Sequence, residues 1–253
     1  MMRRVFCDQK SDRGKQRLQD DGDVPGEYQA AKPTQSLSGS LDPRLVCCIV
    51  MSVLAGLPVT VETGPRWVIA ARANLRALLA DHAHCEQKAA SMALALIGRF
   101  PDHPGLAQAM LTLAYEELSH FRQVLERIEA RGETLTRPLP DRYVRALREW
   151  AFRHKGGIGA LGDLLLVSAF VEARSCERFR LLSQSFTEEP DMELRKLGQF
   201  YGTLAAAESR HWERFRDLAL AADAPKDVEQ RLEAMAQAEG SIVQSLPVEP
   251  RMH

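Results

Sequence analysis

The stretch "AYEELSHF", Ala114–Phe121, places Glu117 three residues before His120 within a segment that has helical spacing of apolar residues. A second stretch, "ESRH" at Glu208–His211, repeats this spacing about ninety residues later. Residues three apart lie on the same face of a helix, so each pair can direct a carboxylate and an imidazole toward one point. The repetition raises the question of whether these pairs are a coincidence, a metal site or two catalytic pairs.

The helix faces that carry the two pairs are otherwise apolar. At offsets of three, four and seven residues, the neighbours are Met110, Leu113, Ala114, Phe121 and Val124 for the first pair, and Tyr201, Leu204, Ala205, Trp212 and Phe215 for the second. Glu116 has different neighbours, such as Thr112 and Ser119, and these tolerate solvent. We therefore expect both Glu-x-x-His pairs to face the core, because helices bury their apolar faces.

Two further segments offer inward glutamates. Glu86 has small and apolar neighbours on its helix face, and "LLADHAHCEQKAA" around it aligns with "LLLVSAFVEARSC" around Glu172. A rival alignment pairs Cys85–Glu86 with Cys176–Glu177 and gives equal spacings of 31 residues to the two Glu-x-x-His pairs. The face of Glu177 is more polar, which favours Glu172 as the inward residue and leaves Glu177 as the alternative.

The composition is that of a helix-rich globular protein. The chain has 253 residues, of which 45% are hydrophobic and 6% aromatic, and its formal net charge is −1. This near-neutral charge does not demand a nucleic acid or a membrane as partner. The cysteines are odd in number and lack C-x-x-C spacing, which argues against a disulfide framework or structural zinc and favours the reducing cytoplasm. They are Cys7, Cys47, Cys48, Cys85 and Cys176.

Apolar periodicity predicts an all-α protein built as an antiparallel four-helix bundle with extra short helices. Long helices are expected over about 65–100, Leu106–Ala130, Leu161–Ser185 and Asp191–Ala222, and shorter ones around Asp141–His154 and after Pro225. The expected division is a disordered or non-family extension over 1–60, the bundle over 61–240 and a polar tail over 241–253. One hypothesis is that synthesis begins at Met51. The apolar run Leu45–Val61 is broken by Gly56 and Pro58, so no membrane span is expected.

Four buried carboxylates make sense together only if cations neutralise them, because each unpaired one costs several kcal/mol. One glutamate from each of two helices, plus Glu-x-x-His from each of two others, is the ligand pattern of ferritin-like di-iron and di-manganese proteins. Oxygen ligands with one imidazole per metal favour iron or manganese over zinc. The predicted ligands are Glu86, Glu117, His120, Glu172, Glu208 and His211. Four other histidines are expected at the surface or in a second layer: His82, His84, His103 and His154.

An insert between the second and third long helices, Arg131–Gly159, is rich in basic residues. Arg142, Arg145 and Arg148 recur at three-residue spacing on its expected helix. Arginines at this density can neutralise the phosphates of a nucleic acid. An ordinary solvated helix face is the alternative interpretation.

The stretches "DHAHCEQKAASMALALI", "YEELSHF", "VEARSCERFRLL" and "ESRHW" resemble the tRNA-(2-methylthio-N6-isopentenyladenosine) hydroxylases, the MiaE family. The similarity covers about Trp67 to Ala222. The resemblance implies a ferritin-like fold and an O2-dependent di-iron monooxygenase that hydroxylates the isopentenyl group of a hypermodified adenosine beside the tRNA anticodon. It implies two iron ions held by the six predicted ligands, no catalytic residue beyond them, and two partners: the tRNA anticodon arm and an external electron-donating reductase.

Two other classes of function stay open. A ferritin- or rubrerythrin-like iron oxidase or peroxidase would need no RNA. The lack of C-x-x-C speaks against a rubrerythrin-type iron module, and the insert distinguishes the chain from compact ferritins. A purely structural bundle would bind no metal and would tolerate replacement of its core glutamates.

Overall fold

The computed structural model describes residues 53–253, so most of the expected N-terminal extension, with Met51, lies outside the described residues. Within 53–253 the regular elements are helices, and no strand occurs there. They are α2 (Pro65–Ala73), α3 (Leu75–Arg99), α4 (Leu106–Ala130), α5 (Arg142–Arg153), α6 (Ala160–Thr187), α7 (Met192–Ala222) and α8 (Pro225–Ser245). The prediction of an all-α chain is confirmed.

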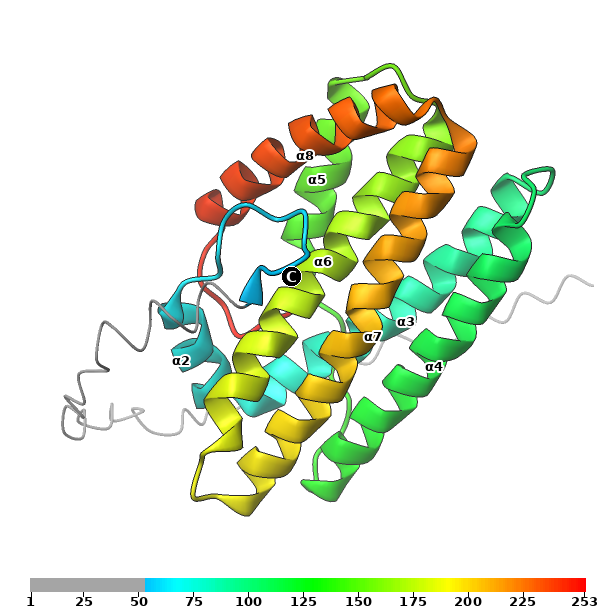
Figure 1. Cartoon of the computed structure of the whole chain (residues 1–253). Helices are drawn as coiled ribbons and strands as arrows, with labels where there is room; N and C mark the ends of the chain where they lie inside the picture. The colour runs from blue at the N-terminus through cyan, green and yellow to red at the C-terminus, as the bar shows by residue number, and fades with distance from the viewer. Residues whose placement is uncertain (1–52) are drawn as a thin grey trace, which may run out of the picture. The chain divides into compact units, whose positions relative to one another are not determined.

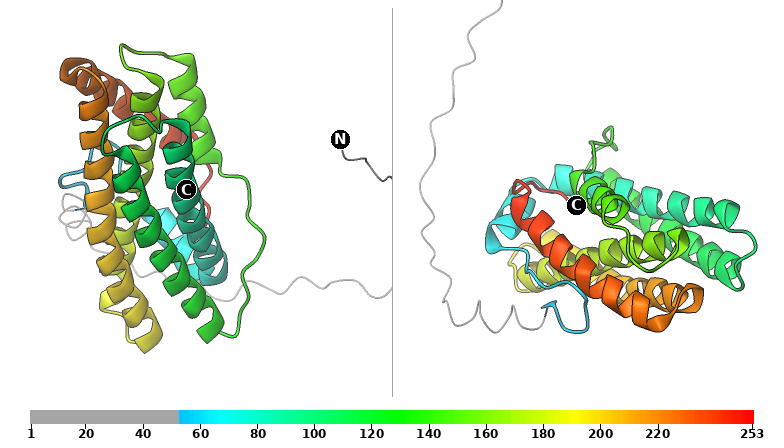
Figure 2. Two further views of the ribbon diagram at one scale, coloured as in Figure 1. Left: turned by 90° about the vertical axis from the view of Figure 1, so that its right-hand side faces the viewer. Right: turned by 90° about the horizontal axis from the view of Figure 1, so that it is seen from above.

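The long helices α3, α4, α6 and α7 run side by side (Figure 1). α3 packs along α4 and α6 packs along α7, so the bundle consists of two helical hairpins. The connections at 100–105 and 188–191 are short, which makes the helices of each hairpin antiparallel. α5 and α8 pack on each other and on α6, outside the four long helices (Figure 2). This is the predicted antiparallel four-helix bundle.

Side-chain caps set the starts of α5 and α3. Asp141 begins α5 by accepting the N–H of Val144 at 3.0 Å. Asn74 begins α3 by accepting the N–H of Ala77 at 3.0 Å. The cap at Asn74 divides the single helix expected over 65–100 into α2 and α3, because a capping residue leaves the helical backbone conformation.

α6 is the central helix, in contact with α2, α5, α7 and α8. Gly198 of α7 lies against its C-terminal end, where an added Cβ would meet the backbone of Phe186 at 3.0 Å. A larger side chain at Gly198 would push the two helices apart, so this glycine sets how closely α7 approaches α6. Close approach of these helices is what brings their carboxylates together.

α8 is longer than the short helix expected after Pro225. It continues to Ser245 and so enters the segment expected to be a polar tail. Glu239 of α8 is fully buried against α6, and Met252 beyond the helix is fully buried as well. Residues near the end of the chain therefore belong to the core of this helical unit.

The described part of the apolar run at Leu45–Val61 also packs on the bundle, since Val53 and Val59 are buried. Among residues 53–253, no helix has both the length and the apolar character that crossing a membrane would require.

Candidate metal centre

Six buried side chains from four helices meet inside the bundle. α3 supplies Glu86, α4 supplies Glu117 and His120, α6 supplies Glu172, and α7 supplies Glu208 and His211. Their possible ligand atoms form two groups, each with all atoms within 4.8 Å of one another: Glu86, Glu117, His120 and Glu208, and then Glu117, Glu172, Glu208 and His211. The structure thus brings together all six residues that the sequence singled out as ligands.

Glu117 and Glu208 belong to both groups, and each divides its two oxygens between them. Glu117 Oε2 lies 3.6 Å from Nδ1 of His120, whereas its Oε1 lies 2.8 Å from Nδ1 of His211. Glu208 does the same, with Oε1 3.8 Å from His120 Nδ1 and Oε2 3.4 Å from His211 Nδ1. A carboxylate that bridges two cations needs this arrangement, with one oxygen facing each.

Glu86 and Glu172 each belong to one group only. Glu86 Oε2 lies 3.6 Å from Nδ1 of His120, and Glu172 Oε2 lies 3.9 Å from Nδ1 of His211. The cluster therefore has two halves of the same composition, each with one terminal glutamate and one histidine. The two shared glutamates join the halves.

The donor atoms fit divalent cations. Four of them are buried and make no well-aligned hydrogen bond among the described residues, although Glu117 Oε1 lies close to His211 Nδ1: Glu117 Oε1, Glu208 Oε2, His120 Nδ1 and His211 Nδ1. Buried polar atoms are seldom left without a partner in a protein, so four such atoms in one cluster point to a bound ligand. Two divalent ions would balance four carboxylates, and the mixture of oxygen and imidazole donors is compatible with iron.

The electrostatics of the cluster agree with a cation site. Burial and the charge of Glu117 raise the pKa of Glu86 well above its usual range. Burial and the charge of Glu208 do the same for the pKa of Glu172. Burial alone would lower the pKa of His211, but Glu208 and Glu117 outweigh it and raise this pKa to about 11. Perturbations of this size in one buried cluster are typical of functional sites.

Two side chains outside the cluster orient its members. Glu116 Oε2 lies 2.6 Å from Nε2 of His211 and leaves Nδ1 of that ring facing the cluster. His82 Nε2 lies 2.6 Å from Oε1 of Glu86, so His82 occupies the second layer around the site. Such partners fix the orientation of a ligand and set its basicity.

Sequence reasoning missed Glu116. Its helix neighbours are polar and its side chain is 33% exposed, as expected of a solvated residue. The one signal was its position beside Glu117, which contacts the same histidine of α7. Of the other histidines, His84 Nε2 lies 2.7 Å from the carbonyl oxygen of Thr136. His103 and His154 lie outside both ligand groups.

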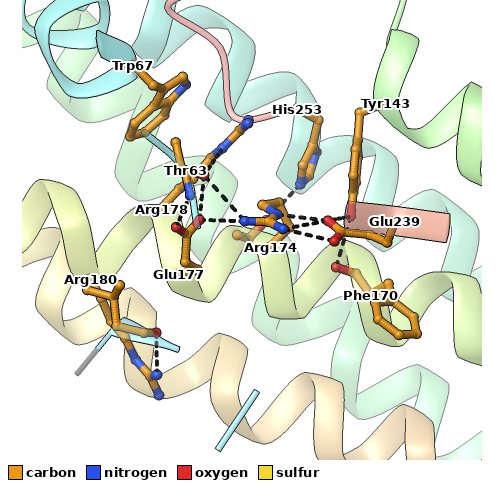
Figure 3. A network of polar contacts seen from close by, with 12 residues as sticks. Thr63, Trp67, Tyr143, Phe170, Arg174, Glu177, Arg178, Arg180, Glu239 and His253 are labelled. Carbon is orange, nitrogen blue, oxygen red and sulfur yellow. Dashed lines mark hydrogen bonds and ion pairs between the residues drawn. The ribbon is translucent and has the colours of Figure 1, made fainter. Parts of the chain in front are cut away.

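Glu177, the alternative ligand on α6, belongs to a different buried cluster (Figure 3). Its Oε2 accepts from Nη1 of Arg174 at 3.0 Å, and its Oε1 accepts the N–H of Thr63 at 2.7 Å. Arg174 Nε also donates to Glu239 at 2.8 Å. The Arg174 network is our name for Thr63, Tyr143, Arg174, Glu177 and Glu239. Both oxygens of Glu177 are occupied by Arg174 and Thr63, and it is Glu172, not Glu177, that belongs to the candidate metal centre.

A cavity of about 370 Å³ between α3, α5 and α6 reaches Glu172. Its wall is largely apolar and includes Met92, Leu96, Val144, Leu164, Val167 and Val171. Lys88, Asp141 and Arg148 add charge to the lining. A small apolar group can therefore lie beside the glutamate cluster while the rest of its molecule meets charged side chains.

The three α5 arginines expected to hold phosphates do not form one patch. Arg148 lines the cavity, and Arg145 and Arg148 line an open groove beside it. Arg142 lines a separate small cavity next to Arg178 and Arg251. All three α5 arginines are exposed.

The bundle and its glutamate–histidine cluster define the chain as a ferritin-like protein with a candidate di-metal centre. A solved structure with this fold, a protein from Synechococcus with aldehyde deformylating oxygenase activity, is 38% identical in sequence. The match has a TM-score of 0.68 and covers 77% of this chain and 94% of that chain.

The family model for tRNA-(MS2IO6A)-hydroxylase (MiaE) matches residues 54–253, and the chain belongs to this family. The tRNA 2-(methylsulfanyl)-N(6)-isopentenyladenosine(37) hydroxylase of Pseudomonas putida is 39% identical over 191 residues, which cover 76% of this chain and 89% of that protein. The hydroxylase of the same name from Salmonella typhimurium is 28% identical over 240 residues, covering 76% of this chain and 85% of that protein. The family match begins before and ends after the stretch in which the sequence itself suggested the resemblance.

Proposed function

We propose that this chain is an O2-dependent di-iron monooxygenase that hydroxylates the isopentenyl group of 2-methylthio-N6-isopentenyladenosine next to the tRNA anticodon. The observation that carries the proposal is the largely apolar cavity that ends at Glu172 of the buried cluster. The names of the MiaE relatives support the choice of substrate. A tRNA substrate implies an enzyme of the cytoplasm.

Glu117 and Glu208 would bridge two iron ions, with Glu86 and His120 completing one half and Glu172 and His211 the other. When bound, the iron pair supplies the redox chemistry that lets O2 react with a C–H bond. In the overall reaction the C–H group, O2, two electrons and two protons give the alcohol and water. The electrons come from a separate reductase.

The protein's own side chains bind and orient the substrate. The apolar wall of the cavity holds the isopentenyl tail and excludes water from it, because burying hydrocarbon surface is favourable. Glu172 marks the end of the cavity that the tail reaches. Glu116 keeps Nδ1 of His211 directed at the cluster, and His82 holds Glu86.

The basic side chains of α5 would hold the phosphates of the anticodon arm. Arg145 and Arg148 lie beside the cavity, whereas Arg142 lies apart from them. Reversing the charge of Arg145 and Arg148 should weaken tRNA binding and flatten its salt dependence, since the slope follows the number of neutralised phosphates. Arg142→Glu alone is the matched control and should have the smaller effect. Equal affinity of all variants in a gel-shift titration would contradict this assignment.

The proposed reaction is tested by supplying iron-loaded protein with O2, a chemical reductant and tRNA that carries the prenylated nucleoside. Mass spectrometry of the digested nucleosides should show a gain of one oxygen atom. Glu172→Ala should abolish the gain, and tRNA without the prenyl group should show none. Free turnover of Fe²⁺ with no modified nucleoside would favour the iron-oxidase alternative. Conversion of a fatty aldehyde to a hydrocarbon would instead favour an aldehyde deformylating oxygenase, the activity of the Synechococcus protein.

A further inference from the structure

The side chain of Phe152, near the C-terminal end of α5, is 75% exposed, the highest value among the large exposed hydrophobic residues that the structure describes. Lys155 Nζ lies 5.7 Å from the centre of its ring. A single exposed apolar residue needs no explanation by itself. Phe152 differs from the other exposed apolar residues in the groove and the basic side chains that surround it.

Phe152 lines an open groove of about 690 Å³ on the surface formed by α3 and α5. Four residues of this groove also line the cavity that reaches Glu172, namely Lys88, Asp141, Val144 and Arg148. The groove and the cavity therefore adjoin each other at these residues. Phe152 lines the groove and not the cavity, so it lies outside the space proposed for the isopentenyl tail.

Positive charge dominates the groove. Its cations are Lys88, Arg145, Arg148 and Arg153, and its carboxylates are Asp141 and Glu149. Glu149 lies 3.2 Å from Arg145 and 3.6 Å from Arg153. Arg148 makes no ion pair within residues 53–253, so its guanidinium is available to a phosphate.

We propose that Phe152 is a stacking platform for the base of a nucleotide that flanks the modified adenosine. This inference rests on the proposed function. The groove would hold the anticodon loop as the isopentenyl tail enters the cavity. Exposed aromatic rings among basic side chains are how proteins bind single-stranded nucleic acid, because every base offers a face for stacking. Arg148 neutralises a phosphate, and Phe152 takes the neighbouring base.

The test measures binding of a prenylated anticodon stem-loop to the full-length protein by fluorescence anisotropy. Phe152→Ala and Phe152→Leu should each weaken binding roughly 5- to 150-fold, the range measured for loss of one stacked base. Phe152→Tyr should bind like the parent protein, because it keeps the ring. Tyr115→Ala removes another aromatic side chain, 67% exposed on α4, and serves as the matched control with unchanged affinity.

Salt dependence separates the two kinds of contact. Arg148→Gln should reduce the slope of log affinity against log salt concentration by roughly 0.7 to 0.9, one phosphate's share. Phe152→Ala should leave this slope unchanged. A lower slope in Phe152→Ala would overturn the stacking role.

Unchanged affinity in Phe152→Ala, with tight binding by the parent protein, would overturn the inference and leave the proposed function standing. Weak binding by Phe152→Ala but not by Phe152→Leu would replace stacking with simple apolar contact. If Phe152→Ala oxidised the stem-loop more slowly but bound it with unchanged affinity, the ring would contact a protein partner and not the RNA. Failure of the parent protein itself to bind or oxidise the stem-loop would remove the proposed function along with the inference.

Discussion

Helix α6 carries two glutamates, Glu172 and Glu177, that are both buried but meet opposite kinds of partner. Glu177 lies in the Arg174 network, where a fully buried guanidinium contacts two carboxylates at 2.8–3.0 Å. Glu172 lies among three other glutamates and two histidines, and its ion-pair partner among residues 53–253 is His211. In the first region the positive partner is a guanidinium, which keeps its proton, whereas in the second it is a pair of imidazoles, which must be neutral to bind a metal ion.

This difference separates a structural cluster from a binding one. A buried carboxylate with a built-in partner holds two elements together, here α6 and α8, and is destabilising only when the partner is removed. A group of buried carboxylates without such a partner is costly until a cation arrives. Substitutions in each region therefore test whether the contrast holds.

The largest effect is expected from removing a glutamate that belongs to both candidate ligand groups. Iron content of protein purified without added metal, measured by plasma emission spectroscopy, should be about two ions per chain and should be lost in Glu117→Ala and in Glu208→Ala. Glu126→Ala on α4, whose side chain is 61% exposed, is the control and should keep the iron. A parent protein that takes up no iron, even after anaerobic loading with Fe²⁺, would leave a structural bundle as the better account.

Substitutions in the Arg174 network should lower the stability of the protein without lowering its iron content. Arg174→Met would leave Glu177 and Glu239 buried without their cation, and we expect a loss of about 3–5 kcal/mol in the free energy of unfolding. Urea unfolding followed by circular dichroism measures this loss. Replacing both glutamates by glutamine in the same variant should restore much of it, and a mild Arg174→Met phenotype would show that the network is not what holds α8.

A matched pair of substitutions on α6 compares the two regions directly in metal-free protein. Burial and Glu208 raise the pKa of Glu172, so the charge of this carboxyl does not stabilise the metal-free fold, and Glu172→Gln should not lower the free energy of unfolding. Glu177→Gln removes a charged acceptor from Arg174 and should cost about 1–3 kcal/mol. If both substitutions changed the free energy of unfolding in urea by the same amount, the proposed difference between Glu172 and Glu177 would be wrong.

The smallest effect is expected at the edge of the candidate metal centre. Glu116→Gln keeps the shape but loses the charge beside His211, and we expect iron affinity to fall about tenfold, the lower end of the range for such partners. The low value reflects the 33% exposure of the Glu116 side chain. Competition with a chelator measures the change, with Glu126→Gln as control. An unaltered iron affinity would mean that the packing of α7, and not Glu116, orients His211.

The six candidate ligands that the structure brings together could be picked out from the sequence, because Glu-x-x-His is a local pattern and helical spacing predicts which residues share its face. The choice of Glu172 over Glu177 followed from the more polar helix face of Glu177, whose partner Arg174 is three residues away, but the second carboxylate on Arg174, Glu239, lies on α8, is 65 residues from it and was not foreseen. Glu116 escaped notice for the same reason, because its partner His211 is 95 residues away. Long-range pairs of this kind leave no trace in helical periodicity.

Helix boundaries show the same limit. The break at Asn74 was hidden because apolar spacing continues across it, and only the cap reveals it. The length of α8 was underestimated because few large apolar residues mark it. Its buried anchor is a glutamate, a residue type that usually indicates solvent.

The division of the bundle into two hairpins has a consequence for folding. Each hairpin joins neighbours in sequence, so it closes a short loop and forms quickly. Each also carries only half of the candidate ligands: α3–α4 holds Glu86, Glu117 and His120, and α6–α7 holds the other three. Each hairpin already contains one pair of mutually repelling glutamates, Glu86 with Glu117 and Glu172 with Glu208. The repulsion between the two pairs is added when the hairpins dock, so iron supply would act most strongly on that last step.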